Sequence, residues 1–242
     1  MTHSGSITPP PPSVGRSSFP AMMPSHEFRP RLLPTEILDT LPVEHPAARA
    51  SRRDLRIFNQ ALGNPRWLAT TVNRLARTGE RVLELGAGVG EMADLVNPLA
   101  IQWDGLDRAP RPAHWPAGSR WHQVDIRTFD RWADYRVIAA NLFFHHFDDD
   151  GLSELGQRIA RHTRLLVIGD LRRGLIQQWL FSAFAHLIRA HRISRHDGWL
   201  SIRAGFRAEE LPDRLGLHPD EWQWKVGTNL SGAYRLIAER RP

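Results

Sequence analysis

Hydrophobic and polar positions change their spacing along the chain. From Pro46 the apolar residues recur every three or four positions with arginines between them, which predicts a helix that buries one side. Gly63 and Asn64 end this pattern, and the proline that follows suits the first turn of a second helix, expected over residues 66–76. Residues 81–85 form a short apolar run that ends in glycines, which predicts a buried strand.

Strands and helices alternate from that point onward. We expect further strands at residues 101–107, 120–126, 136–142, 165–170, 222–226 and 234–239, and helices near 91–95, 150–162, 175–190 and 208–215. This alternation is typical of a parallel, doubly wound sheet, and the last two strands read as an antiparallel pair joined by a turn. The predicted fold is α/β and Rossmann-like, with seven mostly parallel strands and an antiparallel C-terminal hairpin.

The first residues have a different composition. Residues 1–34 hold eight of the 18 prolines, with Ser and Gly between them. Such a segment buries too little apolar surface to offset the entropy of ordering it. We therefore expect residues 1–45 to be largely disordered and residues 46–242 to form one domain, in which 46–78 is a helical cover.

Composition and charge narrow the function classes. The chain of 242 residues has no cysteine, which excludes disulfides, thiolate catalysis and zinc held by cysteines. Its net charge is +6, and the eight arginines between residues 47 and 81, set against Asp54 and Glu80, account for all of it. The rest of the chain is balanced, so the charge argues against a general nucleic-acid surface. Without a signal peptide or a membrane-spanning apolar run, we expect a cytoplasmic protein.

A glycine-rich turn follows the first predicted strand. The glycines of the segment Gly86-Ala-Gly-Val-Gly90 let the backbone turn tightly and approach a ligand, and a following helix offers it unpaired N–H groups. Glu84 precedes the first glycine by two residues, and Asp107 ends the next strand, where a carboxylate can accept hydrogen bonds from ribose hydroxyls. A nicotinamide-binding motif needs its third glycine at position 91, which is Glu91 here.

The acidic residue followed by G-x-G-x-G resembles the first motif of the class I S-adenosylmethionine-dependent methyltransferases. The resemblance extends over roughly residues 79–239, and that family has a seven-stranded sheet ending in an antiparallel hairpin. It implies S-adenosyl-L-methionine as the cofactor. The residues that the resemblance places at the cofactor are Glu84, Gly86, Ala87, Gly88, Gly90, Asp107, Arg108, Asp125, Ile126, Asn141 and Leu142.

The family pattern also implies a role for each group. Glu84 and the glycine loop would hold the methionine part, and Asp107 the ribose. Asp125 and Ile126 would meet the adenine, although Asp125 is also a candidate for a plain cap at a strand end. Asn141 and Leu142 would border the methyl group and the acceptor.

The segment after the fourth strand bears on the acceptor. Asn141-Leu-Phe-Phe lacks the two prolines typical of enzymes that methylate base amines, and it is followed by His145 and His146. It looks more like small-molecule methyltransferases of the ubiquinone/menaquinone and polyketide-tailoring type, which implies secondary metabolism and a small phenolic or polyketide-like acceptor. A neutral imidazole can take the proton of a hydroxyl. If the chain is extended here, the two histidines point in different directions and at most one faces the acceptor.

A second polar cluster lies at residues 194–206. His196 and Asp197 stand beside Trp199, and Asp197 is placed to orient His196 as a base. Equally, Arg195 and Asp197 can form a solvated ion pair. The preceding helix, 175–190, has a broad apolar face that suits core packing, the wall of an apolar pocket, or contact with a membrane surface.

Three functions stay open at this point. The first is methylation, favoured on oxygen, of a small hydroxylated acceptor. The second is a methyltransferase that acts on RNA or protein through the arginine-rich residues 47–81, and the third is a non-catalytic binding domain. We expect no metal, because the histidines lack a clean ligand spacing and Asp148-Asp-Asp150 suits a helix N-terminus. The sequence leaves the oligomeric state open.

Overall fold

The computed structural model describes residues 31–33, 36–42, 44–96 and 101–242. The expectation of disorder for residues 1–45 therefore lies largely outside the described residues. Where the structure does describe this segment, it contains the short helix α1 (Ile37–Thr40). Residues 31–242 form one compact unit.

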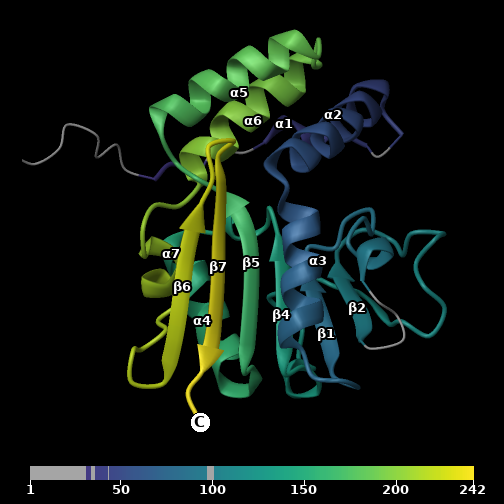
Figure 1. Cartoon of the computed structure of the whole chain (residues 1–242). Coiled ribbons are helices and arrows are strands. Elements are labelled where there is room, and N and C mark those ends of the chain that lie inside the picture. Colours follow the sequence, from purple (N-terminus) through teal and green to yellow (C-terminus); the bar gives the residue numbers. More distant parts are fainter. Residues whose placement is uncertain (1–30, 34–35, 43, 97–100) are drawn as a thin grey trace, which may run out of the picture. The chain divides into compact units, whose positions relative to one another are not determined.

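Seven strands form one sheet, as the sequence predicts. They are β1 (Arg81–Leu85), β2 (Gln102–Asp107), β3 (Trp121–Gln123), β4 (Val137–Asn141), β5 (Leu165–Leu171), β6 (Trp222–Thr228) and β7 (Ala233–Arg240). Their order across the sheet is β3-β2-β1-β4-β5-β7-β6. The first five are parallel, and β7 runs antiparallel to both of its neighbours (Figure 1). The order reverses direction at β1, so the strand ends beside β1 and β4 are the place where such sheets bind ligands.

Seven α-helices and three 3₁₀ helices accompany the sheet in the described residues. Besides α1 these are α2 (Pro46–Leu62), α3 (Asn64–Leu75), η1 (Ala93–Leu95), η2 (Trp132–Asp134), η3 (Phe144–His146), α4 (Asp149–His162), α5 (Leu175–Leu187), α6 (Arg192–Ala204) and α7 (Glu210–Arg214). The side chain of Asp148 caps α4 by accepting from the amide of Gly151 at 2.8 Å, which confirms the reading of the aspartates as a helix N-terminus. No helix of the described residues is long and apolar enough to cross a membrane.

Apolar residues on both faces of the sheet explain the layers. On one face Leu68 and Val72 of α3 pack with Val82 and Val167 of the strands. On the other face α4 and α7 cover a larger core that includes Tyr135, Phe144 and Trp222; its helical members are Leu152, Leu155, Ile159 and Leu211. Burial of both faces is why the parallel strands appear as unbroken apolar runs.

The remaining helices gather at one end of the sheet. Figure 1 shows α1, α2, α5 and α6 together above the ends of β4 and β5. This is the carboxyl end of the parallel strands, so the turns that carry the predicted site residues open toward these helices.

Several element boundaries differ from the prediction. The strand expected at 120–126 is only Trp121–Gln123, because the chain turns at Asp125, whose carbonyl accepts from the amide of Thr128. The helix expected near 91–95 is the single 3₁₀ turn η1. The polar cluster at residues 194–206, for which no helix was expected, lies largely in the helix α6.

Candidate active site

The glycine turn after β1 needs glycine for a steric reason. Gly86 has a φ of +67°, and a Cβ atom there would lie 2.2 Å from the ring of Phe143. Asp107 at the end of β2 accepts from the amide of Gly88 at 2.7 Å through one oxygen and from that of Ala109 at 2.8 Å through the other. Asp107 therefore fixes the shape of the turn.

A cavity of about 510 Å³, here the strand-end cavity, opens beside this turn. Six of the residues predicted to bind the cofactor line it: Gly86, Asp107, Arg108, Asp125, Ile126 and Leu142. They come from the ends of four neighbouring strands, although nearly 60 residues of sequence separate the first from the last. The volume lies within the usual range for ligand sites, about 300–1,000 Å³.

The other five predicted cofactor residues do not line this cavity; they are Glu84, Ala87, Gly88, Gly90 and Asn141. Two of these five, Asn141 and Glu84, carry side-chain oxygens that are buried in the protein. Asn141 donates to Asn59 of α2 at 3.0 Å, and Asn59 donates to Glu91 at 3.2 Å. The oxygen Oδ1 of Asn141 and Oε1 of Glu91 are buried and accept no hydrogen bond from any described residue. Such orphan acceptors are costly unless a donor reaches them.

Glu84 of β1 is buried as well. Its carboxylate accepts from the indole of Trp103 at 2.7 Å. Burial, with the charges of Asp107 and Glu91 acting in the same direction, raises the pKa of Glu84 to about 8 against the lowering effect of that hydrogen bond. The acidic residue of the motif is thus held largely protonated near neutral pH in the ligand-free protein.

A second cavity, here the helical cavity, has a volume of about 490 Å³ and lies among the helices at the sheet end. Its lining is mostly apolar and comes from α2, α5, α6 and the β6–β7 turn. Phe58, Leu180, Phe181 and Phe184 supply much of its surface. The apolar face of α5 therefore forms a pocket wall, one of the three roles that its sequence allowed.

Four residues line both cavities: Glu36, Leu142, His145 and His146. Leu142 has a φ of +51°, which is unusual for a leucine, and its amide donates to the carbonyl of Gly169 at 2.7 Å. Strained backbone of this kind tends to be kept where a site needs it. The boundary between the cavities is thus built by the turn after β4 and by Glu36 from the segment before α1.

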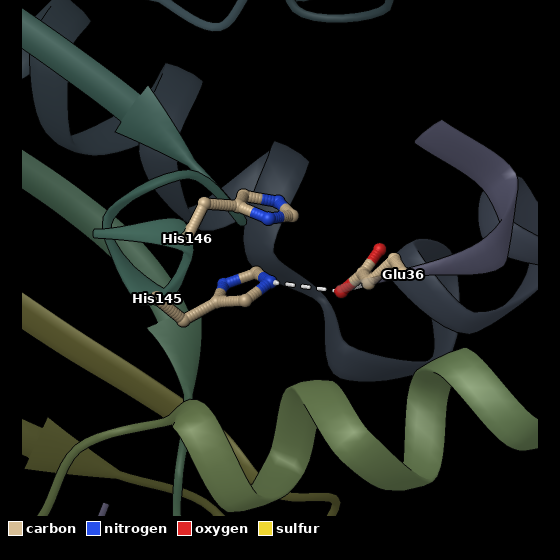
Figure 2. Close-up of side chains that lie close together, drawn as sticks. All are labelled: Glu36, His145 and His146. Atoms are coloured by element: carbon tan, nitrogen blue, oxygen red, sulfur yellow. Dashed lines mark ion pairs between the residues drawn. The ribbon is translucent and has the colours of Figure 1, made fainter. Parts of the chain in front are cut away.

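His145 is held from behind by Asp170 of β5. Its Nδ1 lies 2.7 Å from Oδ1 of Asp170, which is fully buried and also accepts from the amides of Phe144 and Leu171. Burial alone lowers the pKa of His145, but the charge and hydrogen bond of Asp170 outweigh it, and the pKa is raised overall. The Nε2 atom of His145 is left facing the carboxylate of Glu36, 3.9 Å away (Figure 2).

His146 lies beside His145, with ring centroids 4.2 Å apart. The expectation that the two histidines point in different directions is wrong, because residues 144–146 form the turn η3 instead of an extended strand. The exposed surface of His146 borders the two cavities. The protein around the ring, with the adjacent His145 acting in the same direction, lowers the pKa of His146 to about 3, so His146 is neutral.

The second predicted pair lies elsewhere. His196 Nδ1 is 2.9 Å from Asp197 Oδ1, and neither residue lines either cavity. Asp197 accepts from the amides of Ile37 at 3.1 Å and Leu38 at 2.9 Å. Asp197 thus holds the segment that carries Glu36.

Four polar residues of this region were not predicted from the sequence to belong to the site: Glu36, Asn59, Glu91 and Asp170. Asp170 did leave a signal, since a carboxylate ends an otherwise wholly apolar strand. Glu36 left none, because it lies in a proline-rich segment with no helical or strand pattern.

Comparison with known proteins agrees with this geometry. A family model described as a methyltransferase domain matches residues 60–211. No curated protein matches the chain in sequence. Among solved structures, the plantazolicin methyltransferase BpumL in complex with SAH is 14% identical, with a TM-score of 0.64 over 85% of this chain and 93% of that one.

The magnesium protoporphyrin IX methyltransferase ChlM from Synechocystis PCC 6803, with bound SAH, is 13% identical. Its TM-score is 0.51, over 78% of this chain and 86% of that one. The family match covers more than half of the chain, and the structural matches share its seven-stranded fold. The chain therefore belongs to the methyltransferase domain family, as a class I S-adenosylmethionine-dependent methyltransferase.

Proposed function

We propose that the protein binds S-adenosylmethionine in the strand-end cavity and methylates a hydroxyl oxygen of a small, largely apolar acceptor held in the helical cavity. The observation that carries the proposal is the shared boundary of the two cavities. Methyl transfer needs donor and acceptor in line and in contact. Two adjoining cavities of about 510 and 490 Å³ provide that arrangement at Leu142, His145 and His146.

The donor groups of the cofactor match acceptors in the strand-end cavity and next to it. S-adenosylmethionine supplies an electrophilic methyl group on a sulfonium, and it also carries an ammonium group. Outside the cavity lining, the buried Oδ1 of Asn141 accepts no hydrogen bond from the described residues, and Asn59 connects Asn141 to Glu91; these acceptors suit that ammonium. Asp107 and Asp125 line the strand-end cavity with carboxylates that can accept from ribose and adenine donors.

The acceptor class follows from the helical cavity. Phe58, Phe181 and Phe184 surround an apolar space, and the polar groups among its lining are few, with Gln177 and Ser201 among them. A phenolic or polyketide-like molecule with one hydroxyl at the boundary satisfies this distribution. Glu36, His145 and His146 would contact that hydroxyl and promote the loss of its proton. A place in secondary metabolism and a cytoplasmic location remain predictions.

A macromolecular acceptor has less support. The arginines between residues 47 and 81 would have to attract a polyanion, but several are already paired. Arg49 pairs with Glu44, Arg53 with Asp54, and Arg81 with Asp104. The neighbouring structures named for plantazolicin and magnesium protoporphyrin IX show that the fold serves unlike acceptors, so the choice depends on the cavity.

One matched pair of variants tests both cavities. Asp125→Ala removes a carboxylate from the strand-end cavity and should weaken binding of S-adenosylhomocysteine about tenfold, the cost of one lost hydrogen bond. Ala61→Phe fills part of the helical cavity and should leave that affinity unchanged while it abolishes transfer to phenolic acceptors. Calorimetry gives the affinities, and a screen of phenols, quinols, fatty acids and tRNA with labelled cofactor gives the transfer.

Transfer to tRNA or to protein, with none to any hydroxylated small molecule, would overturn the acceptor assignment. Unchanged S-adenosylhomocysteine affinity in Asp125→Ala would overturn the placement of the adenosine.

A further inference from the structure

Three side chains at the cavity boundary form a cluster whose chemistry goes beyond proton transfer. Glu36, His145 and His146 each place one potential ligand atom within 4.8 Å of the others. Figure 2 shows both imidazoles and the carboxylate of Glu36 converging on the same space, although they come from opposite sides of it. The cluster combines η3, which follows β4, with a segment more than 100 positions earlier in the chain.

The donor types select the kind of ion. Two imidazoles and one carboxylate are the ligand set that Zn²⁺, Fe²⁺, Co²⁺ and Mn²⁺ accept, whereas Mg²⁺ and Ca²⁺ prefer oxygen ligands throughout. Three protein ligands also leave coordination positions open for a water or an acceptor oxygen. The spacing of residues in the sequence does not indicate this ligand set, because Glu36 lies more than 100 positions before the two histidines. Glu36 also lies outside the residues that the family model matches.

Asp170 provides the support that metal-binding histidines usually have. A histidine ligand generally donates its second ring N–H to a carboxylate, which fixes the tautomer and aims the other nitrogen. Asp170 stands 2.7 Å from Nδ1 of His145 and leaves Nε2 directed at Glu36. Asp170 is itself held by two backbone amides, and the hydroxyl of Ser201 donates to Glu36. Two of the three groups are therefore oriented before any ion binds.

The distances need only a small adjustment. Two ligand atoms about 2.0–2.2 Å from one ion stand roughly 3–3.5 Å apart. Nε2 of His145 and Oε1 of Glu36 are 3.9 Å apart, so a shift of under about 1 Å brings this pair to that spacing. All three ligand atoms lie within 4.8 Å of one another, so His146 needs a shift of at most about 2 Å. The exposed surface of His146 and the shared lining of both cavities give an ion a route to the cluster.

We propose that Glu36, His145 and His146 bind one divalent transition-metal ion of the Zn²⁺ type at the boundary of the cavities, and that its open position takes the acceptor hydroxyl. Only the role in catalysis rests on the proposed function; the binding does not. An ion lowers the pKa of a bound hydroxyl. The hydroxyl proton then passes to water and the new O–C bond forms to the methyl group. The C–S bond breaks and leaves its electron pair on sulfur.

Metal binding can be measured without any acceptor. Full-length protein without a histidine tag is stripped with a chelator and titrated with Zn²⁺ by calorimetry, and with Co²⁺ by visible absorption. We expect one ion per chain. Glu36→Gln and His146→Ala should weaken Zn²⁺ binding at least tenfold, and Asp170→Asn should weaken it about tenfold through His145. His218→Ala removes an exposed imidazole outside both cavities and should change nothing.

The far-UV circular dichroism spectrum and the thermal unfolding transition of each variant are also measured, and an unchanged spectrum with cooperative unfolding shows that the fold is intact. Absence of Zn²⁺ binding by the wild-type protein, or binding that survives both Glu36→Gln and His146→Ala, would overturn the site. Zn²⁺ binding with no transfer to any hydroxylated acceptor would support the site and refute the proposed function. Full transfer by the stripped protein in the presence of chelator would overturn the catalytic role of the ion.

Discussion

Leu142 carries backbone strain at the point where the two cavities meet. Its φ of +51° costs a leucine free energy that the surrounding structure must offset, and the hydrogen bond that its amide donates to the carbonyl of Gly169 helps to hold it there. The left-handed conformation turns the chain out of β4 and allows η3 to bring both histidines to one side.

The stability of variants at Leu142 should follow the backbone preference of the new residue instead of its hydrophobicity. Valine is branched at Cβ and tolerates positive φ poorly, whereas asparagine adopts it readily. We expect Leu142→Val to destabilise the protein by about 1–2 kcal/mol more than Leu142→Asn. Urea unfolding of the two variants measures the difference. A more stable valine variant would show that side-chain burial, not strain, dominates at this residue.

Glu84 should make stability depend on pH. Its pKa is raised to about 8 in the folded protein, so the folded state holds a proton that the unfolded chain releases above its ordinary value near 4.5. The stabilising contribution is complete below pH 4.5 and is lost as the pH rises toward 8, by at most about 1.4 kcal/mol per pH unit. The unfolding free energy of the wild-type protein should therefore fall relative to Glu84→Gln between pH 5 and 8. Parallel curves would contradict the raised pKa.

At the scale of elements, α6 shows why the second polar cluster was difficult to interpret. Its buried side includes Ser194, Asp197 and Ser201, so the apolar periodicity of a packed helix is interrupted. Each of these polar groups binds a partner from the first 60 residues: Ser194 donates to Asp54, Ser201 donates to Glu36, and Asp197 accepts from two amides beside α1. Partners so distant in sequence cannot be inferred from a local pattern.

The strands were easier to predict, because burial on both faces makes each a continuous apolar run bounded by turns. Local patterning did not predict the turn η3 at residues 144–146, which follow the predicted end of the fourth strand at residue 142. The amide of Phe144 donates at 3.0 Å to Asp170 on the neighbouring strand, a contact that only the assembled sheet provides. Six residues of the strand-end cavity could be predicted from the strand ends, whereas much of the helical cavity depends on such long-range contacts.

The contact between α4 and the residues after α7 tests how tightly the elements pack. A Cβ atom on Gly156 would lie 2.0 Å from the carbonyl oxygen of Leu215. Gly156→Ala should therefore destabilise the protein by about 1–3 kcal/mol, although alanine favours a helix. Ser153→Ala, at an exposed position of the same helix, serves as the control and should change the unfolding free energy little. Equal thermal stability of the two variants would mean that the helices separate at little cost.

At the scale of the whole molecule, charge is unevenly distributed along the chain but partly compensated in space. The arginines of the segment 47–81 account for the net charge of +6, yet acidic partners come from outside that segment. Glu44, Glu91 and Asp104 each lie within ion-pair distance of one of these arginines. The surface near α2 is therefore less positive than the sequence alone indicates.

Nucleic-acid binding should accordingly be weak. A labelled single-stranded RNA is titrated with the protein at about 50 mM and 200 mM salt, a range over which a protein that neutralises several phosphates loses orders of magnitude in affinity. We expect no saturable binding at micromolar protein in either buffer. Micromolar or tighter binding with a steep salt dependence would instead favour the RNA-modifying alternative.

The position of Glu36 has an evolutionary consequence. Outside the residues that the family model matches, the strand-end cavity takes only Leu33 and Glu36, whereas the helical cavity takes Glu36, Leu55 and Phe58 from before the match and the turn at Leu230 from after it. Sequence changes outside the matched residues therefore reshape the helical cavity more than the strand-end cavity. Under the proposed function, relatives that differ there would differ in acceptor more than in methyl donor.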